Sequence, residues 1–442
     1  MNKTISRRRL LVLAAMAAGG AGLAWARRFL GAPNLSAQGG TALEPRAYLP
    51  HVAKTAPTAT PTATPTRTPT ATPTRTATPT RTPTPTATST GQPPPGNLSG
   101  RVIHIHANGV TAWAPGGDSA YWNYVSQSKV NEMVDRGMRE LTGRSTAADA
   151  WQALLPNYQA GQKVAIKVSF NNQWSGSCND TNPAIDSVIE PVNAVVNRLI
   201  GIGVAAGDIW IYDAMRPIPN RFTNRGVAGV QYYDNGSCRN PASWSSTTVS
   251  FSPPAGAPMP GTQRLPELLV NATYLINMPI MKHHACAGVS LAFKNHFGTI
   301  DNPAGMHNNV FLLGLGCGSS GGYRSDYSPL IDLYRSPHIG PKTILTIGDG
   351  LFAALSQENQ PPSTWTVFNN QVPKSLFFAT DAVAIDSVMC DWLWLEGGSL
   401  RQEAYNYLLL ARDAGLGVYE HGDPTNANGS SYSQIYYRRF EV

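Results

Sequence analysis

The densest group of side chains that bind ligands or transfer protons lies between positions 274 and 300. This segment reads YLINMPIMKHHACAGVSLAFKNHFGTI, and its polar residues include Lys282, His283, His284, Cys286, Lys294 and Asn295. Lysine ammonium groups hold carboxylate or phosphate oxygens as point charges, and imidazole suits divalent transition metals. This combination predicts a site for a small anionic ligand, with a divalent metal as its cofactor.

A strand and a helix are expected to position this segment. Residues 274–277 are predicted to form a strand that ends at Pro279, the lysine and histidines a loop, and about 288–297 a helix. In open α/β sheets, ligands bind beyond the carboxyl ends of the strands, where helix N-termini also point. The loop therefore lies where a site is expected.

Strand and helix patterns also alternate through the rest of residues 98–442. Further strands are predicted at 101–107, 163–170, 208–212, 343–347, 376–378 and 434–442. Helices are predicted at 129–141, from Asn182 with Pro183 at the first helical position, and from Thr380 or Asp381 to about Leu395. The pattern predicts an α/β domain with a largely parallel sheet and helices on both faces. A long irregular insertion is expected at about 214–266.

Several blocks, taken in order, resemble the uncharacterised bacterial family named domain of unknown function 362. Residues 281–284 and 291–300 are similar to its Lys-x-His and Lys-Asn-x-x-Gly signature, and 161–167, 211–213, 347–350 and 380–386 to further blocks. The resemblance covers most of 101–400. It implies that the candidate site also includes Lys167, Asp213, His307, Asp349 and Asp386. It supports a fold and a set of residues rather than a reaction.

The candidate residues divide into two roles. Ligand binding is assigned to Lys167, Lys282, Lys294 and Asn295, and metal ligation to His284, His307, Asp349, Asp386 and Asp213. Structural alternatives stay open: Lys167 as a lysine that reaches water at a strand end, Asp386 as half of a buried salt bridge, and Asp381 as a helix N-cap. If these residues form a site, most of them should line one pocket at the carboxyl ends of the parallel strands.

Cysteine spacing bears on both cofactor and compartment. The chain has five cysteines and no CxxC pair, which argues against a ferredoxin-type iron–sulfur cluster. Cys178 and Cys238 both follow Gly-Ser in polar segments. In an oxidising compartment these two are the preferred disulfide pair.

The N-terminal region contains a predicted targeting signal. Residues 6–11 read SRRRLL, which resembles a twin-arginine export signal, and small-residue cleavage sites occur at 24–26 and 35–37. Residues 1–37 are therefore predicted to be a signal peptide read by the twin-arginine translocase. An uncleaved anchor, the only expected membrane contact, is the alternative. Residues 38–97 are rich in Thr and Pro, which predicts a disordered stalk before one α/β domain at 98–442 outside the cytoplasm.

The charge distribution argues against nucleic-acid binding. The chain has 34 basic and 27 acidic residues, a net charge of +7, but residues 1–97 hold eleven of the bases and one acid. Residues 98–442 therefore carry a net charge of −3. A nucleic-acid footprint requires basic residues on the folded surface.

Three functions are compatible with these observations. The leading hypothesis is an exported, enzyme-like domain that binds a carboxylate or phosphate ligand together with a divalent metal. The second is a non-catalytic ligand-binding protein of the cell surface. The third is a redox protein that uses Cys286 and Cys317, which the missing cluster motifs disfavour.

Export supplies the first test. The variant Arg7→Lys/Arg8→Lys should accumulate in the cytoplasm, because the translocase recognises the arginine pair. Fractionation of cells that express the full chain measures this, with Arg27→Lys/Arg28→Lys as the matched control. Normal export of the Arg7→Lys/Arg8→Lys variant would show that the twin-arginine assignment is wrong.

Overall fold

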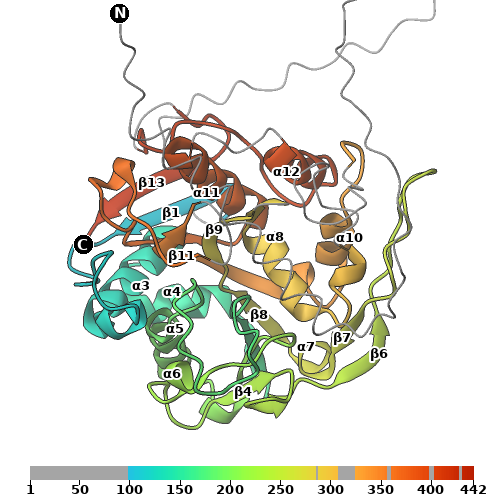
Figure 1. Cartoon of the computed structure of the whole chain (residues 1–442), viewed down its shortest axis with the longest axis horizontal. Coiled ribbons are helices and arrows are strands. Elements are labelled where there is room, and N and C mark those ends of the chain that lie inside the picture. Colours follow the sequence, from blue (N-terminus) through green and yellow to red (C-terminus); the bar gives the residue numbers. More distant parts are fainter. Residues whose placement is uncertain (1–97, 285–286, 307–323, 356–359, 398–402, 428–430) are drawn as a thin grey trace, which may run out of the picture. The chain divides into compact units, whose positions relative to one another are not determined.

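The computed structural model describes residues 98–442 apart from 285–286, 307–323, 356–359, 398–402 and 428–430. The predicted signal peptide (1–37) and stalk (38–97) lie outside the described residues, as do Cys286, His307 and Cys317. No helix in the described part combines the length and apolar character that a membrane span requires. Strands alternate with helices in an α/β fold, as the sequence predicts (Figure 1).

Among the described residues, eleven strands form one mostly parallel sheet. Its main path runs β13-β1-β12-β11-β8-β2-β3-β4-β5, while β9 pairs with β11 and β10 with β9. The strands are β1 (Arg101–His106), β2 (Val164–Lys167), β3 (Ile209–Tyr212), β4 (Gln231–Asp234), β5 (Asn240–Pro241), β8 (Tyr274–Asn277), β9 (Ile280–His284), β10 (Gly288–Ser290), β11 (Thr343–Ala354), β12 (Ser375–Ala379) and β13 (Tyr436–Glu441). Only β12 on the main path is antiparallel to its neighbours. The carboxyl ends of β1, β11, β8, β2 and β3 therefore lie on one edge, here called the carboxyl edge.

Helices cover both faces of the sheet (Figure 1). One face, called the α5 face, packs against α3 (Gln127–Thr142), α4 (Ala147–Leu154) and α5 (Ile189–Gly201). The other, called the α11 face, packs against α8 (Ala292–Asn295), α10 (Pro329–Arg335), α11 (Ala382–Gly397) and α12 (Glu403–Asp413). Leu275 and Ile276, neighbours in β8, belong to different cores. Consecutive side chains of a strand point to opposite faces, so both faces of β8 are buried.

Shorter elements complete the described part. They are the 3-10 helices η1 (Tyr121–Tyr124), η2 (Ala206–Asp208), η3 (His296–Thr299), η4 (Gly340–Lys342) and η5 (Thr366–Phe368), and the helix α7 (Glu267–Asn271).

Two sequence predictions about local structure are wrong. The helix expected from Asn182 begins at Ile189, because the Asn182 side chain accepts a hydrogen bond from the Ala184 backbone N–H instead (3.0 Å), a turn that competes with a helix start. The residues expected as a loop at 280–284 form β9, which pairs with β11, and 288–290 form β10 rather than helix. The first error comes from a local turn, and the second from pairing with a strand that is distant in sequence.

The region 214–266 is more regular than expected. After α6 (Asn220–Thr223), β4 and β5 continue the main sheet beyond β3. A separate antiparallel pair, β6 (Trp244–Thr248) and β7 (Arg264–Pro266), follows. Strands of two to five residues are too short to show an alternating pattern, so the sequence predicted an irregular insertion.

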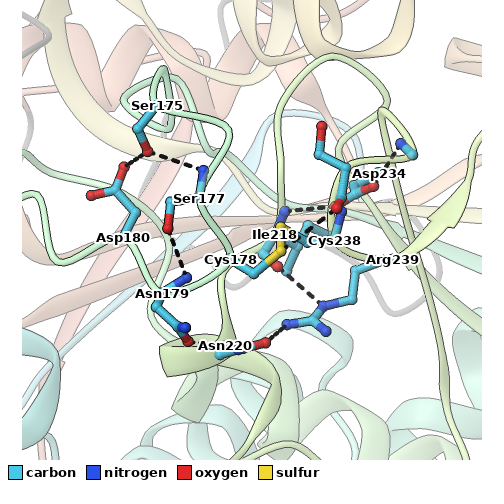
Figure 2. The surroundings of a disulfide bond; sticks show 12 residues. Ser175, Ser177, Cys178, Asn179, Asp180, Ile218, Asn220, Asp234, Cys238 and Arg239 are labelled. Carbon is cyan, nitrogen blue, oxygen red and sulfur yellow. Dashed lines mark hydrogen bonds between the residues drawn. A yellow bond between two sulfur atoms is a disulfide. The ribbon is translucent and has the colours of Figure 1, made fainter.

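A disulfide fixes part of the carboxyl edge (Figure 2). The bond joins Cys178, which follows β2, to Cys238, which follows β4, with Cα atoms 5.4 Å apart. The buried Asp234 carboxylate accepts the backbone N–H groups of Ile218 (3.0 Å), Gly236 (2.7 Å) and Cys238 (3.1 Å). Together these bonds hold the segment after β2 against the segment after β3.

Candidate functional site

Lys167, the last residue of β2, is fully buried. Its Nζ lies 3.2 Å from Asp213 Oδ2 and 3.4 Å from Asn295 Oδ1, and it also donates to the Val168 carbonyl. Asp213 directly follows β3, the strand beside β2. Burial lowers the pKa of Lys167, and the Asp213 charge opposes this shift. Lys167 is therefore one half of a buried ion pair and does not reach water at the strand end.

The same lysine belongs to a hydrogen-bonded network on the α11 face. Asn295 Nδ2 donates to Asn277 Oδ1 (2.7 Å), and Asn277 Nδ2 donates to the carbonyl of Ala292 (3.0 Å). The N–H of Ala292 donates in turn to Asp386 Oδ1 (2.8 Å). Residues from β2, β8, α8 and α11 are thus joined, and four of the predicted site residues lie on this one network: Lys167, Asp213, Asn295 and Asp386.

Two of the predicted metal ligands already have donors on both oxygens. Asp386 accepts from Ala292, from the Phe293 N–H (3.2 Å) and from the Tyr407 hydroxyl (3.0 Å). Asp213 accepts from the N–H groups of Phe170 and Met215, at 3.1 Å each, besides Lys167. Protein donors therefore occupy three of the roughly four acceptor positions of each carboxylate, which leaves each of them little capacity for a metal.

The remaining predicted ligands do not complete a metal centre in the described part. There, no three His, Cys, Asp or Glu side chains come together in a way that would hold an ion. His284 Nδ1 accepts the Ala287 N–H at 3.2 Å, and His307 lies outside the described residues. The metal set proposed from sequence is therefore not assembled here, and the metal stays a prediction.

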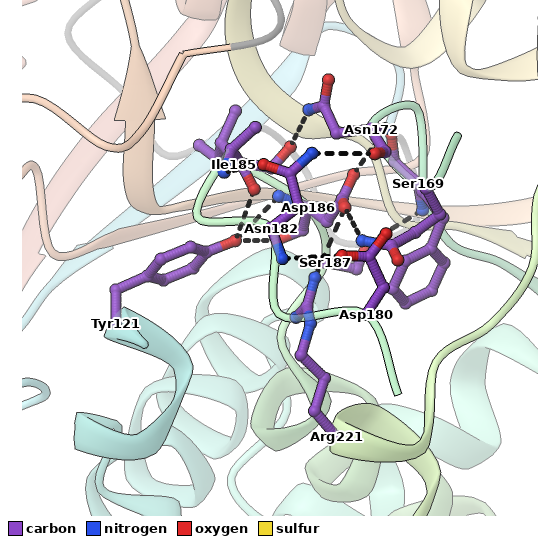
Figure 3. Close-up of polar contacts among 12 residues, drawn as sticks. Tyr121, Ser169, Asn172, Asp180, Asn182, Ile185, Asp186, Ser187 and Arg221 are labelled. Carbon is purple, nitrogen blue, oxygen red and sulfur yellow. Dashed lines mark hydrogen bonds and ion pairs between the residues drawn. The ribbon is translucent and has the colours of Figure 1, made fainter. Parts of the chain in front are cut away.

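A second charged group, on the α5 face, surrounds Asp186 (Figure 3). This carboxylate is 2% exposed and accepts from the Asn172 N–H (3.1 Å) and Gln173 Nε2 (2.7 Å). Arg221 Nη2 lies 3.4 Å from its Oδ2. Burial raises the pKa of Asp186 to about 6, and the charges of Arg221 and Lys282 act against this shift.

Cationic side chains outnumber the carboxylate in this group. Arg216 is half-buried and interacts electrostatically with both Asp213 and Asp186, and its guanidinium carbon lies 3.5 Å from the centre of the exposed Trp174 ring. Because Asp213 is already paired with Lys167, Arg216 and Arg221 together outweigh the charge of Asp186. Lys282 adds a third cation to the same surroundings.

Asp349 lies on the same face of the sheet. It is the Cα partner of Ile280 in β9, and its Oδ1 accepts the Leu351 N–H at 3.0 Å. Burial raises the pKa of Asp349 to about 7, and the charge of Glu190 adds to the shift. The Tyr121 hydroxyl bonds to the Asp186 backbone and interacts electrostatically with both Asp186 and Asp349. Tyr121 therefore connects Asp349 to the cationic group.

The candidate residues are thus divided between two faces rather than gathered in one pocket. Lys282 follows Ile280 by two residues and so shares its face, the α5 face. Lys294 belongs to α8 on the α11 face, with its Nζ 3.5 Å from the centre of the Phe297 ring. Arg216 interacts with acids of both groups, so the two meet at the carboxyl edge.

Sequence reasoning missed the most densely charged part of this edge. Asp186 fell inside a predicted helix, and Arg216 and Arg221 fell inside the predicted irregular insertion. A signal was present, because an acid between Ile185 and Val188 needs a partner when both neighbours are buried. The sequence did not show which cation would supply it.

Comparison with known proteins identifies the family. The model of the family described as Domain of unknown function (DUF362) matches residues 164–391, just over half of the chain. That span contains the network on the α11 face and the group around Asp186. No curated protein matches the chain. The chain belongs to the DUF362 family.

The buried ion pair yields a stability prediction. Lys167→Met should lower the free energy of unfolding by about 3–5 kcal/mol, because it leaves the Asp213 charge buried without its partner. The matched control is Lys163→Met, at the amino end of the same strand, whose pair with Asp208 is partly exposed and is worth at most about 1 kcal/mol. Chemical denaturation of both variants measures the difference. Equal small losses would contradict the assigned role of Lys167.

Proposed function

We propose that the carboxyl edge binds a small ligand bearing carboxylate or phosphate groups. The main support is the set of cationic side chains around Asp186, where the positive charges of Arg216 and Arg221 exceed the negative charge of one carboxylate. The Arg221 side chain is only 9% exposed. A buried charge is costly unless an opposite charge lies beside it. Asp186 offsets only one of these two arginines, and an anionic ligand would offset the other.

The side chains suit different parts of such a ligand. Guanidinium groups hold carboxylate or phosphate in a planar, two-bond arrangement, and the contact with Trp174 orients Arg216. Lys282 adds a compact charge from β9. The Cys178–Cys238 disulfide holds the loop that carries Trp174 and Asp186, and it suits the oxidising surroundings expected of an exported protein.

Asp349 favours an enzyme-like role over simple binding. A carboxyl group with a pKa of about 7 exchanges protons readily at neutral pH, as a general acid or base must. Asp349 shares the α5 face with the cationic group, which supports proton transfer near the bound ligand.

Metal analysis tests the cofactor part of the sequence hypothesis separately. If a divalent metal belongs to the protein, material purified from its native host should contain about one equivalent of zinc, manganese or iron without sulfide. Iron together with sulfide would favour the redox alternative based on Cys286 and Cys317. If the purified protein contains no metal and still binds anions, the metal hypothesis is rejected and the anion-site hypothesis is kept.

Anion binding is tested with inorganic phosphate and citrate as probes. Isothermal titration of the full chain should show binding of at least one probe, weakened on the order of tenfold in Arg216→Met because a charge-assisted contact is lost. The control is Arg198→Met, because Arg198 on α5 forms an exposed pair with Asp135 on α3. Asp186→Asn should strengthen binding, since it removes the competing negative charge.

The Asp186→Asn variant keeps the test independent of folding damage. A destabilised protein loses affinity, whereas this substitution is expected to raise it. If neither probe binds, or if Arg216→Met and Arg198→Met behave alike, the carboxyl edge is not an anion site.

A further inference from the structure

A pocket lies at the other end of the carboxyl edge. It has a volume of about 530 Å³ and is lined by His106, Asn108, Phe368, Gln371, Arg439 and Glu441, among others. The strands β12, β11 and β8 separate β1 from β2. At about 4.8 Å per strand, the end of β1 lies roughly 19 Å from the end of β2, and none of the charged residues around Asp186 lines this pocket. It is therefore distinct from the proposed anion site and does not depend on it.

Three charged or titratable side chains are linked on its wall. His106 Nδ1 lies 2.5 Å from Glu441 Oε2, and Arg439 Nη2 lies 3.0 Å from Glu441 Oε1. Burial lowers the pKa of His106, with Glu441 opposing this shift and Arg439 and Lys374 adding to it. A neutral His106 donates its Nδ1 proton to Glu441, so Nε2 is left as an acceptor.

An aromatic ring and amide groups provide the rest of the lining. The Phe368 ring stacks with His106 at 5.8 Å between ring centres and an interplanar angle of 20°. Gln371 Oε1 accepts a hydrogen bond from Lys374 Nζ at 2.5 Å, so the Gln371 amide nitrogen is available as a donor. The lining therefore offers hydrogen-bond donors and acceptors together with an aromatic ring.

The backbone of this pocket argues against an anionic ligand. Asn369 and Asn370 both have a φ of 55°, and left-handed residues after a helical turn can form a nest of N–H groups that binds anions. Here those donors are used, because the Asn369 N–H bonds to the Thr366 carbonyl (3.1 Å) and the Asn370 N–H to the Trp365 carbonyl (2.9 Å). The Glu441 carboxylate on the wall also offsets the positive charge of Arg439.

We propose that this pocket binds a neutral polyhydroxylated ligand, such as one monosaccharide unit of a glycan. Each hydroxyl group both donates and accepts hydrogen bonds, which matches a lining that offers the Glu441 carboxylate, His106 Nε2, the Gln371 amide and the Arg439 guanidinium together. The volume falls within the range of about 300–1,000 Å³ that small-molecule sites occupy.

The experiment uses the full chain and saturation-transfer NMR. The probes are glucose, galactose, mannose and xylose, with citrate as the anionic comparison. At least one sugar should bind, and Glu441→Gln should weaken it on the order of tenfold, because the substitution removes the negative charge and replaces one of the two acceptor oxygens that face His106 and Arg439 with a donor. The control is Arg438→Gln on the same strand, whose guanidinium lies over the Tyr436 ring instead.

The outcomes distinguish a ligand-binding role of Glu441 from a purely structural role in the pairing of β1 with β13. A purely structural role of Glu441 would lower stability without changing sugar affinity in the folded protein. Failure of all four sugars to bind would overturn the proposal, as would equal effects of Glu441→Gln and Arg438→Gln. Citrate binding that is lost in Arg439→Gln would also overturn it, by making the pocket an anion site. Arg216→Met should leave sugar binding unchanged, so this test is independent of the anion proposal.

Discussion

The ion pair between Lys167 and Asp213 is the constraint on which the carboxyl edge depends. Both side chains are almost completely buried where β2 and β3 end, and neither charge is tolerated there alone. Their meeting requires β2 and β3 to pair in parallel register, and it requires a close approach by the chain after α8. A Cβ atom on Gly298 would lie 2.6 Å from Lys167 Nζ and 2.9 Å from Asp213 Oδ1, so only glycine fits. The position of α8 follows from these contacts.

The two faces of the sheet use charge differently. On the α11 face, acids and the lysine satisfy one another and the backbone, which leaves a rigid support with little capacity for a ligand or metal. On the α5 face, Arg216 and Arg221 exceed the charge of Asp186, and Asp349 keeps its proton to about neutral pH. Ligand binding and proton transfer are therefore expected on the α5 face. The network on the α11 face holds the strand ends in place on the opposite side of the sheet.

Parallel strands explain why two separate candidate sites share one edge. All parallel strands end at the same edge of the sheet, where the loops that follow them can hold polar groups without breaking the sheet. The strand β12 lies beside β1 and is antiparallel to it, so the amino end of β12 lies at this edge. The segment before it, which includes Asn369 and Gln371, thus lines the pocket beside His106. One sheet positions a cationic group at one end of this edge and a mixed polar pocket at the other.

The sequence by itself determined the local features of this protein. Apolar runs fixed the strands at Arg101–His106 and Tyr274–Asn277, and Asp381 caps α11 by accepting the N–H groups of Val383 and Ala384 at 3.0 Å each. These depend on neighbours within a few residues, which a sequence displays directly. Only the tertiary structure decided that β9 is a strand and that Asp186 meets two arginines, because pairing and charge compensation depend on groups distant in sequence that meet in space.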